Sequence, residues 1–308
     1  MPDHEAGARQ RLTADYADGR ERGFRPFSLE EPAAKELYPG TFSRHAAAYK
    51  QRLDEVMARR ESRGRAAVID WVTPTPGKHV LDLACGPGTL SYRLARDVSP
   101  EGEVVGIDLA PGMIELARGE APPGLPVRFE LMDMEDLRFP DAAFDAAVCG
   151  HGLQFVPDLL RALTEARRVL KPGARFAASV PVDPSQPSEA QAILERAVDG
   201  HLPPAPRARD QFSTRRTIED ELALATVAGQ AGFHEASVVR FEESTTWTSP
   251  RHFIEMASGW WSLAVRLDAI PPTERAAILA RGVHALEAEL GMGPLQIAGA
   301  SSVLRATV

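Results

Sequence analysis

Three carboxylates and one glycine-rich turn are the groups in this sequence best suited to holding a ligand. Asp82, Asp108 and Asp133 each lie within or just after a short apolar run that we expect to be a buried strand. The turn Gly86-Pro87-Gly88 follows the first of these runs. Glycines let the backbone approach a ligand closely, and a helix starting after them offers free N–H groups. The pattern predicts a nucleoside-type ligand at one edge of a sheet.

The position of each carboxylate indicates what it would bind. Asp82 lies four residues before the first glycine, where a carboxylate suits a cationic amino group better than a diphosphate. Asp108 lies twenty residues after Gly88, the spacing at which an acidic side chain takes a ribose diol. Asp133 would accept a hydrogen bond from an adenine amine. Two alternatives remain: Asp82 could cap a local turn, and Asp133 could belong to a solvated acidic turn.

The elements that must position these residues alternate regularly along the chain. Predicted strands cover residues 79–84, 104–107, 127–131, 144–149 and 176–180, and predicted helices between them cover 89–98, a segment from Pro111, and 159–170. Such alternation with short links indicates a doubly wound α/β fold with a mostly parallel sheet and helices on both faces. Ligands of these sheets bind beyond the carboxyl ends of the strands.

The flanking regions have a different pattern. The first 40 residues predict a partly ordered lead segment, followed by helices at 42–60 and 64–72. After the fifth strand, further helices are expected at 189–198, 217–231, 250–268 and 272–290, with strands at 236–247 and within 295–308. We therefore expect residues 1–63 to form a lead segment and lid helix. Residues 64–308 would form the ligand-binding domain, with cap insertions at about 181–215 and 248–292.

Composition excludes several classes of protein. The 308 residues are 44% hydrophobic and carry a net charge of −8, which is ordinary for a globular chain but argues against a general nucleic-acid binder. No apolar stretch approaches the roughly 20 residues of a membrane span, and the polar N-terminus does not resemble a secretory signal. Two cysteines make no disulfide framework, so we expect a reducing, cytoplasmic setting. We also expect the protein to be a monomer or a homodimer.

Three motifs together suggest a family. They are Asp82-Leu83-Ala84-Cys85-Gly86-Pro87-Gly88, Gly106-Ile107-Asp108-Leu109-Ala110-Pro111-Gly112-Met113, and Asp133-Met134-Glu135-Asp136-Leu137-Arg138-Phe139-Pro140 followed by Phe144-Asp145. With them, residues 80–180 resemble the class I S-adenosylmethionine-dependent methyltransferases, in particular the small-molecule branch related to ubiquinone and menaquinone synthesis. The resemblance covers about a third of the chain.

The resemblance implies a seven-stranded Rossmann-like sheet with an antiparallel last strand and a helical cap. It also implies S-adenosylmethionine as cofactor, with S-adenosylhomocysteine as product. Residues matching the family's cofactor-binding positions are Asp82, Ala84, Gly86 and Gly88 for the methionine part, Asp108, Leu109 and Met113 for the ribose and adenine, Asp133 and Met134 for the adenine edge, and Cys149 or Gly150 beside the sulfonium.

Other side chains are candidates for the acceptor side. His151, just past the fourth strand, could act as a base or could simply pack near the cofactor. Gln154 and Phe155 would shape the same wall, and Tyr49 could be a lid residue or an ordinary core tyrosine. At least one of the adjacent Trp260 and Trp261 could line the acceptor pocket or an oligomer contact. Alternatively, one of the two could lie in the hydrophobic core and the other on the surface. No metal-binding constellation stands out.

The leading hypothesis is methyl transfer to an O or C atom of a quinone-like or secondary-metabolite acceptor. A second hypothesis keeps the bound S-adenosyl ligand but assigns a non-methylating step such as a cyclisation. An NAD(P) oxidoreductase is disfavoured because Ser91 occupies the place of the third glycine of a dinucleotide loop. A methyltransferase acting on nucleic acid or protein is disfavoured by the acidic charge and by the sequence Cys149-Gly150-His151-Gly152 after the fourth strand.

Overall fold

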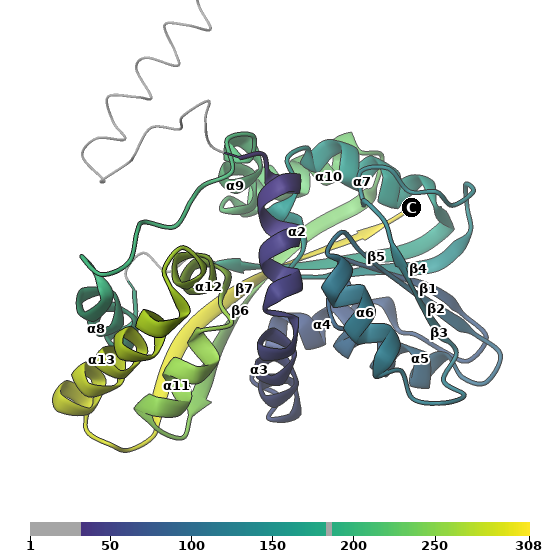
Figure 1. Ribbon diagram of the computed structural model, residues 1–308. Helices are drawn as coiled ribbons and strands as arrows, with labels where there is room; N and C mark the ends of the chain where they lie inside the picture. The colour runs from purple at the N-terminus through teal and green to yellow at the C-terminus, as the bar shows by residue number, and fades with distance from the viewer. Residues whose placement is uncertain (1–31, 183–186) are drawn as a thin grey trace, which may run out of the picture.

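The computed structural model describes residues 32–182 and 187–308 and contains one seven-stranded sheet (Figure 1). The strand order is β3-β2-β1-β4-β5-β7-β6. The strands are β1 (His79–Leu83), β2 (Glu103–Asp108), β3 (Val127–Leu131), β4 (Phe144–Gly150), β5 (Leu170–Val182), β6 (His234–Trp247) and β7 (Leu295–Thr307). β1 to β5 pair in parallel, and β7 pairs antiparallel with both β5 and β6. The predicted fold, including its antiparallel last strand, is confirmed.

Helices cover both faces of the sheet because successive strand residues face opposite ways. In β1, Leu81 and Leu83 belong to the core shared with α7 (Leu159–Arg168) and α10 (Glu221–Gln230). Val80 belongs to the opposite core, shared with α4 (Arg63–Val72) and α5 (Thr89–Val98). α6 (Pro111–Gly119) packs beside α5 and β3. The carboxyl ends of the strands are left free of these helices, as a ligand site requires.

A second hydrophobic core lies around the far ends of β6 and β7, which continue beyond the parallel strands (Figure 1). It is formed by α8 (Glu189–Val198), α11 (Pro250–Ala257), α12 (Trp261–Asp268) and α13 (Pro272–Leu290). Trp247 and Phe253 are completely buried within it. These helices lie on one side of α2 (Ala34–Arg44) and α3 (Ala46–Ala58), and α6 lies on the other (Figure 1).

Four sequence predictions of element boundaries were wrong. The segment predicted as one helix at 42–60 is two helices meeting at His45, and α2 begins at Ala34, inside the predicted lead segment. The segment 217–231 is divided between α9 (Phe212–Ile218) and α10, because the Asp220 carboxylate accepts from two backbone N–H groups and starts a new helix. The segment 250–268 is likewise α11 and α12, and β5 starts at Leu170 rather than residue 176.

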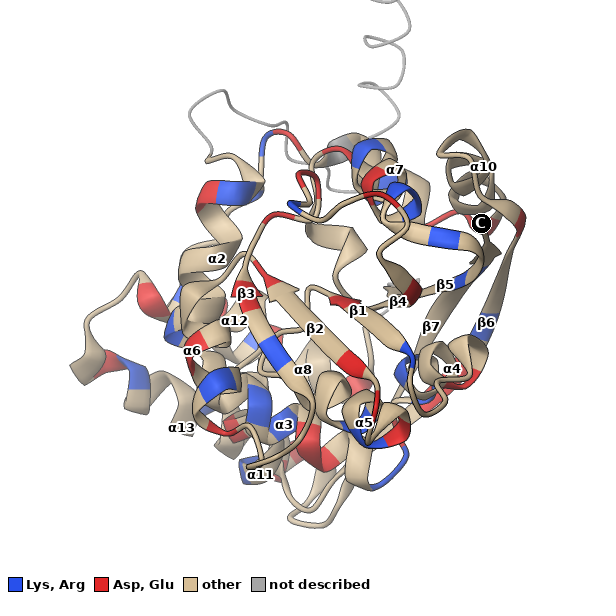
Figure 2. Cartoon of the chain, turned by 90° about the vertical axis from the view of Figure 1, so that its right-hand side faces the viewer, with Lys and Arg blue, Asp and Glu red and all other residues tan. Residues whose placement is uncertain are grey.

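Basic and acidic residues are interspersed along the helices and strands seen in Figure 2. Among residues 32–182 and 187–308, no helix has the length and apolar character to cross a bilayer. Within the same ranges, no group of three His, Cys, Asp or Glu side chains is arranged to hold a metal ion.

Candidate functional site

A cavity of about 780 Å³ lies at the carboxyl ends of the central strands, with α2 and α3 on its open side. Its walls are mainly apolar, as is typical of small-molecule sites. It brings together most of the residues predicted from the sequence, namely Tyr49, Ala84, Gly86, Asp108, Leu109, Met113, Asp133, Met134, Gly150, His151 and Phe155. We refer to it as the main cavity.

Asp108 occupies the end of β2 with its carboxylate facing the main cavity. One oxygen accepts from the Gly86 N–H at 2.9 Å and the other from the Ala110 N–H at 2.8 Å. Burial raises the pKa of this carboxyl, and the backbone hydrogen bonds act in the opposite direction. Because a carboxylate can accept about four hydrogen bonds, Asp108 retains capacity for a ligand diol.

Asp82 lies instead beside a smaller cavity of about 250 Å³, which shares Tyr49, Ala84, Gly86 and Gly150 with the main cavity. The alternation along β1 turns Asp82 toward α5, where the Ser91 hydroxyl donates to it at 2.5 Å. The carboxyl is 1% exposed, and burial raises its pKa to about 7. Ser91 therefore hydrogen-bonds the carboxylate, and no cation pairs with it within the described part of the chain.

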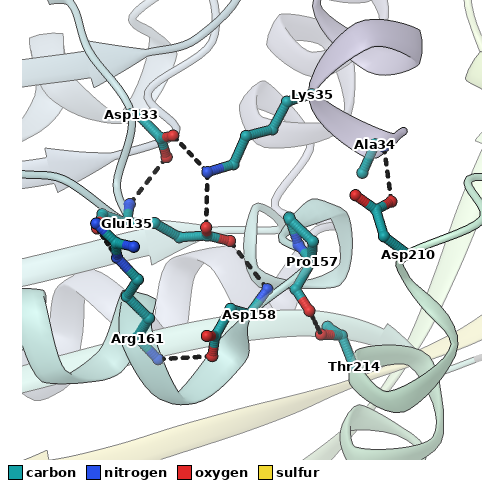
Figure 3. Close-up of polar contacts among 9 residues, drawn as sticks. All are labelled: Ala34, Lys35, Asp133, Glu135, Pro157, Asp158, Arg161, Asp210 and Thr214. Atoms are coloured by element: carbon teal, nitrogen blue, oxygen red, sulfur yellow. Dashed lines mark hydrogen bonds and ion pairs between the residues drawn. The ribbon is translucent and has the colours of Figure 1, made fainter. Parts of the chain in front are cut away.

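Asp133 has a partner that the sequence did not reveal. The Lys35 ammonium of α2 donates to Asp133 Oδ2 and to Glu135 Oε2, each at 2.6 Å (Figure 3). Desolvation lowers the pKa of Lys35, but the hydrogen bonds to Asp133 and Glu135 outweigh it and the pKa is raised. Asp133, the carboxylate predicted to bind the adenine edge, thus also forms an ion pair with α2.

Further contacts join α2 to the segment before α9, and α9 to the segment before α7 (Figure 3). The Ala34 N–H donates to Asp210 Oδ1 at 2.8 Å, and the Thr214 hydroxyl donates to the Pro157 carbonyl at 3.2 Å. Glu135 itself is 5% exposed and accepts from the Asp158 N–H at 2.9 Å through its other oxygen. These contacts hold α2 over the edge of the sheet that carries Asp133.

His151 lines the main cavity immediately after β4. Its backbone has a φ of +62°, a conformation uncommon for a residue with a side chain and often found at functional sites. Its Nε2 lies 3.1 Å from the Ser301 hydroxyl of β7. Desolvation first, and then the positive charges of Arg65 and Arg52, hold the pKa of His151 well below its ordinary value. The imidazole is therefore neutral at pH 7.

Aromatic rings form the wall opposite the strand ends. Tyr38 and Phe42 of α2 contact Phe155 with ring centres 4.8 and 5.1 Å apart, and Phe42 contacts Tyr49 at 5.8 Å. The sequence analysis did not single out Lys35 and Tyr38, which fall in the predicted partly ordered lead segment, or Phe42, which is the first residue of the helix predicted at 42–60. Their spacing of three and four residues is the signal that could have found them, since it places all three on one helix face.

Comparison with known proteins agrees with this geometry. A family described as "Methyltransferase domain" matches residues 80–173. The chain is 36% identical over 147 residues to a 2-phytyl-1,4-naphtoquinone methyltransferase of Synechococcus elongatus, covering 47% of this chain and 63% of that protein. It is 37% identical over 143 residues to an aklanonic acid methyltransferase of a Streptomyces species, covering 44% of this chain and 65% of the relative.

Residues 80–173 are a domain of the class I S-adenosylmethionine-dependent methyltransferase family. The expected cofactor of the methyltransferase domain is therefore S-adenosylmethionine. A phosphoethanolamine N-methyltransferase structure from Haemonchus contortus shares the fold, with a TM-score of 0.55 and 16% identity over 92% of this chain and 61% of that one. The chain spans less than two thirds of the curated relatives named above.

The observed site of the methyltransferase domain fits this cofactor in two respects. Asp82 is a buried carboxylate without a cationic partner in residues 32–182 and 187–308, and an ammonium group would supply one. Asp108 presents a carboxylate with unused acceptor capacity. The cavities beside these two carboxylates share a wall, so one elongated ligand could reach both.

The remaining predicted residues line neither cavity. Gly88 has a φ of +85°, and a Cβ there would lie 2.8 Å from Phe129 Cζ, so this glycine serves the packing of the turn. Cys149 is completely buried. Gln154 donates to the His151 carbonyl at 2.8 Å. Trp261 contacts Tyr38 with ring centres 4.9 Å apart, whereas Trp260 contacts Phe253 at 5.5 Å.

Proposed function

We propose that the protein transfers a methyl group from S-adenosylmethionine to an O or C atom of a planar small-molecule acceptor. The supporting observation is the main cavity, which is lined by Asp108 and Asp133 at the strand ends and by aromatic rings of α2 and Phe155. The relatives named as quinone and aklanonic acid methyltransferases support an acceptor of quinone or secondary-metabolite type.

In this proposal, the three carboxylates hold different parts of one cofactor molecule that extends through both cavities. Asp82 would pair with the amino group of the cofactor, Asp108 with its ribose diol, and Asp133 with its adenine edge. Gly150 lines both cavities and would lie beside the sulfur. When bound, the cofactor supplies a methyl group that is already activated for in-line displacement. The chain then contributes mainly by orienting the acceptor, which can be worth roughly 7–11 kcal/mol.

The aromatic wall would orient the acceptor. Edge-to-face contacts fix Tyr38, Phe42 and Phe155 relative to one another, with interplanar angles of 60° and 75°. A planar ring system would be held against these rings by dispersion and by the same kind of aromatic contact. We propose that α2, α3 and the helices of the cap segments 181–215 and 248–292 together cover the acceptor and exclude water from the reacting atoms.

His151 would hydrogen-bond the acceptor rather than remove a tightly held proton. Its neutral imidazole faces the main cavity and can accept a hydrogen bond from an acceptor hydroxyl. A histidine whose pKa is held low is a weak base. We therefore infer that the acceptor ionises readily or requires no proton removal before methyl transfer.

Calorimetric titration with S-adenosylhomocysteine and with NADH tests the cofactor assignment. We expect the S-adenosyl ligand to bind at least tenfold more tightly than NADH. Asp108→Asn should weaken that binding at least tenfold, whereas Asp70→Asn, an exposed carboxylate of α4, should leave it unchanged. Preferential binding of NADH would refute the proposal.

Transfer of labelled methyl from S-adenosylmethionine to a panel of hydroxylated naphthoquinols tests the reaction. We expect label in at least one of them, and at least tenfold slower labelling at limiting cofactor concentration when Asp108→Asn replaces the wild-type protein. Tight binding of the cofactor with no transfer to any member would contradict the proposed acceptor class.

A further inference from the structure

Gln211 is a buried glutamine that contacts two walls of the main cavity without lining it. The residue is 2% exposed and directly precedes α9. A residue at this position often caps the following helix with its side chain, but Gln211 makes no such hydrogen bond. Its amide is directed instead toward α2 and toward the short helix η2 (Leu153–Phe155). The side chain therefore joins other elements and does not stabilise the start of its own helix.

Both ends of the Gln211 amide are hydrogen-bonded. Its oxygen accepts from the Tyr38 hydroxyl of α2, and its nitrogen donates to the Gln154 carbonyl of η2. Because a carbonyl oxygen can only accept, the contact with Gln154 fixes which end of the amide faces Tyr38. The Gln154 side chain in turn donates to the His151 carbonyl at 2.8 Å. These three hydrogen bonds in series join α2 to the end of β4, and we call them the amide link.

The two ends of the amide link both line the main cavity. At one end, the Tyr38 ring contacts Phe155 and Trp261 with ring centres 4.8 and 4.9 Å apart. At the other end, His151 has a φ of +62°, a conformation that persists only where surrounding contacts hold it. The Gln154 side chain supplies one such contact to the His151 carbonyl. The link therefore fixes an aromatic ring and an imidazole relative to each other.

The segment that carries Gln211 is itself attached on both sides. Asp210 accepts from the Ala34 N–H at 2.8 Å, which ties the segment to the start of α2 (Figure 3). Thr214 of α9 is 1% exposed, and its hydroxyl donates to the Pro157 carbonyl at 3.2 Å, just beyond η2. Gln211 lies between these two attachments, so its amide has a defined place between α2 and η2.

We propose that Gln211 is a positioning residue for methyl transfer, holding Tyr38 and His151 in one relative arrangement around the acceptor. The inference rests on the proposed function, because only a transfer reaction requires that arrangement. In-line displacement needs an aligned acceptor atom, and a misplacement of about 1 Å can lower the rate about 100-fold. Gln211 is not among the described residues that line the main cavity, so it acts through Tyr38 and Gln154.

Tyr38→Phe is the sharpest test of the link, because it removes the hydroxyl and keeps the ring. Amide hydrogen exchange of residues 151–155 is measured by mass spectrometry in the ligand-free protein. We expect Tyr38→Phe and Gln211→Met each to speed this exchange at least threefold. The double variant should exchange no faster than Gln211→Met alone, because the hydroxyl acts only through the amide. Unchanged exchange of residues 151–155 in Tyr38→Phe would overturn the proposal.

Two matched controls separate the link from a general loss of stability. Tyr92→Phe removes a hydroxyl that donates to the Ala117 carbonyl of α6 at 2.6 Å. Gln296→Met replaces an exposed glutamine of β7. Neither control should alter exchange of residues 151–155. If the controls speed this exchange as much as the test variants do, Gln211 has no specific role and the proposal is overturned.

The consequence for the reaction is measured with a naphthoquinol that accepts labelled methyl. Gln211→Met should lower kcat at least tenfold, because the acceptor is no longer held in line with the methyl group. The acceptor KM and the affinity for S-adenosylhomocysteine should each change less than threefold, since the cofactor-binding carboxylates and the aromatic rings remain. An unchanged kcat, or a tenfold loss of cofactor affinity in its place, would mean that Gln211 does not position the acceptor.

Failure of this inference and failure of the proposed function give different results. If the wild type transfers methyl to no naphthoquinol, the proposed acceptor class is wrong, and hydrogen exchange in the ligand-free protein still decides whether α2 is linked to His151. If the wild type transfers methyl and Gln211→Met does so with a normal kcat, the proposed function stands and the positioning role of Gln211 is refuted.

Discussion

Replacing Asp82 with asparagine should remove a loss of stability that the ligand-free wild type undergoes as pH rises, and it should weaken cofactor binding. Burial raises the pKa of this carboxyl from 3.8 to about 7. Between these two pH values the folded state binds more protons than the unfolded state, so this group makes stability fall as pH rises. One pKa unit corresponds to about 1.4 kcal/mol. From pH 5.5 to the folded pKa, the wild type should therefore lose roughly 2 kcal/mol that the asparagine variant keeps.

The comparison between two pH values removes the effects that do not depend on pH. Asparagine brings an amide that must find a new partner near Ser91, which can cost about 1–3 kcal/mol at every pH. The difference in Tm between variant and wild type should nevertheless shift by about 4 °C in favour of the variant between pH 5.5 and pH 8.5. Thermal unfolding followed by circular dichroism measures this shift. Asp70→Asn, a substitution at an exposed carboxylate, should show no such shift.

When S-adenosylhomocysteine is bound, the wild type should be more stable than the Asp82→Asn variant. An ammonium group stabilises the ionised form of Asp82, so we expect S-adenosylhomocysteine to bind Asp82→Asn at least tenfold more weakly than wild type at pH 8.5. Wild-type affinity should fall as pH drops below about 7. If the variant and the wild type show the same pH dependence of Tm, the burial argument for Asp82 is wrong. Equal affinities would show that the carboxylate does not hold the ammonium.

Three other measurements follow from the packing and charges. Gly88→Ala should destabilise the protein by about 2–4 kcal/mol, because a Cβ would lie 2.8 Å from Phe129 and 2.9 Å from Tyr92 and the backbone φ is +85°. The control Gly119→Ala, whose Cβ would meet no atom within 4 Å, should leave stability nearly unchanged in the same denaturant titration. Equal unfolding midpoints for the two variants would contradict the clash. Lys35→Met should speed amide hydrogen exchange of residues 34–44 at least threefold. The Tm should fall by less than about 2 °C, because a partly exposed ion pair contributes little to global stability. Unchanged exchange would mean that the Lys35 ion pairs do not stabilise α2. His151, identified in NMR spectra by comparison with His151→Asn, should show no titration between pH 6.5 and pH 8, because desolvation first and then the charges of Arg65 and Arg52 hold its pKa well below the ordinary value. A midpoint in that window would mean that the imidazole is more open to solvent than the structure has it.

Local patterns were sufficient to predict the parallel sheet and its ligand-bearing edge. The alternation of short apolar runs and amphipathic helices gave β1 to β4 close to their observed bounds, because each signal lies within a few consecutive residues. A carboxylate after a parallel strand must lie at the carboxyl edge of the sheet. Asp108 and Asp133 therefore reached the cavity as predicted, without any knowledge of long-range contacts.

Helix boundaries in the flanking regions were harder to predict, since several were decided by single residues within continuous helical patterns. Asp220 divides a helical stretch by capping the helix that follows it. α2 includes Pro39, which normally indicates the end of a helix, and begins before the helix predicted at 42–60. Packing of α2 against α6 and α12 outweighs this local signal.

Only the tertiary structure decided which groups neutralise one another and which remain uncompensated. Lys35 meets Asp133 across 98 residues of sequence, and His151 meets Ser301 across 150. No spacing rule predicts such pairs, because the intervening chain can close them in many ways. The same holds for Arg52 and Arg65: from the sequence they are two of many arginines on amphipathic helices, and their burial without an acidic partner becomes visible only when α3, α4 and the strand ends are brought together.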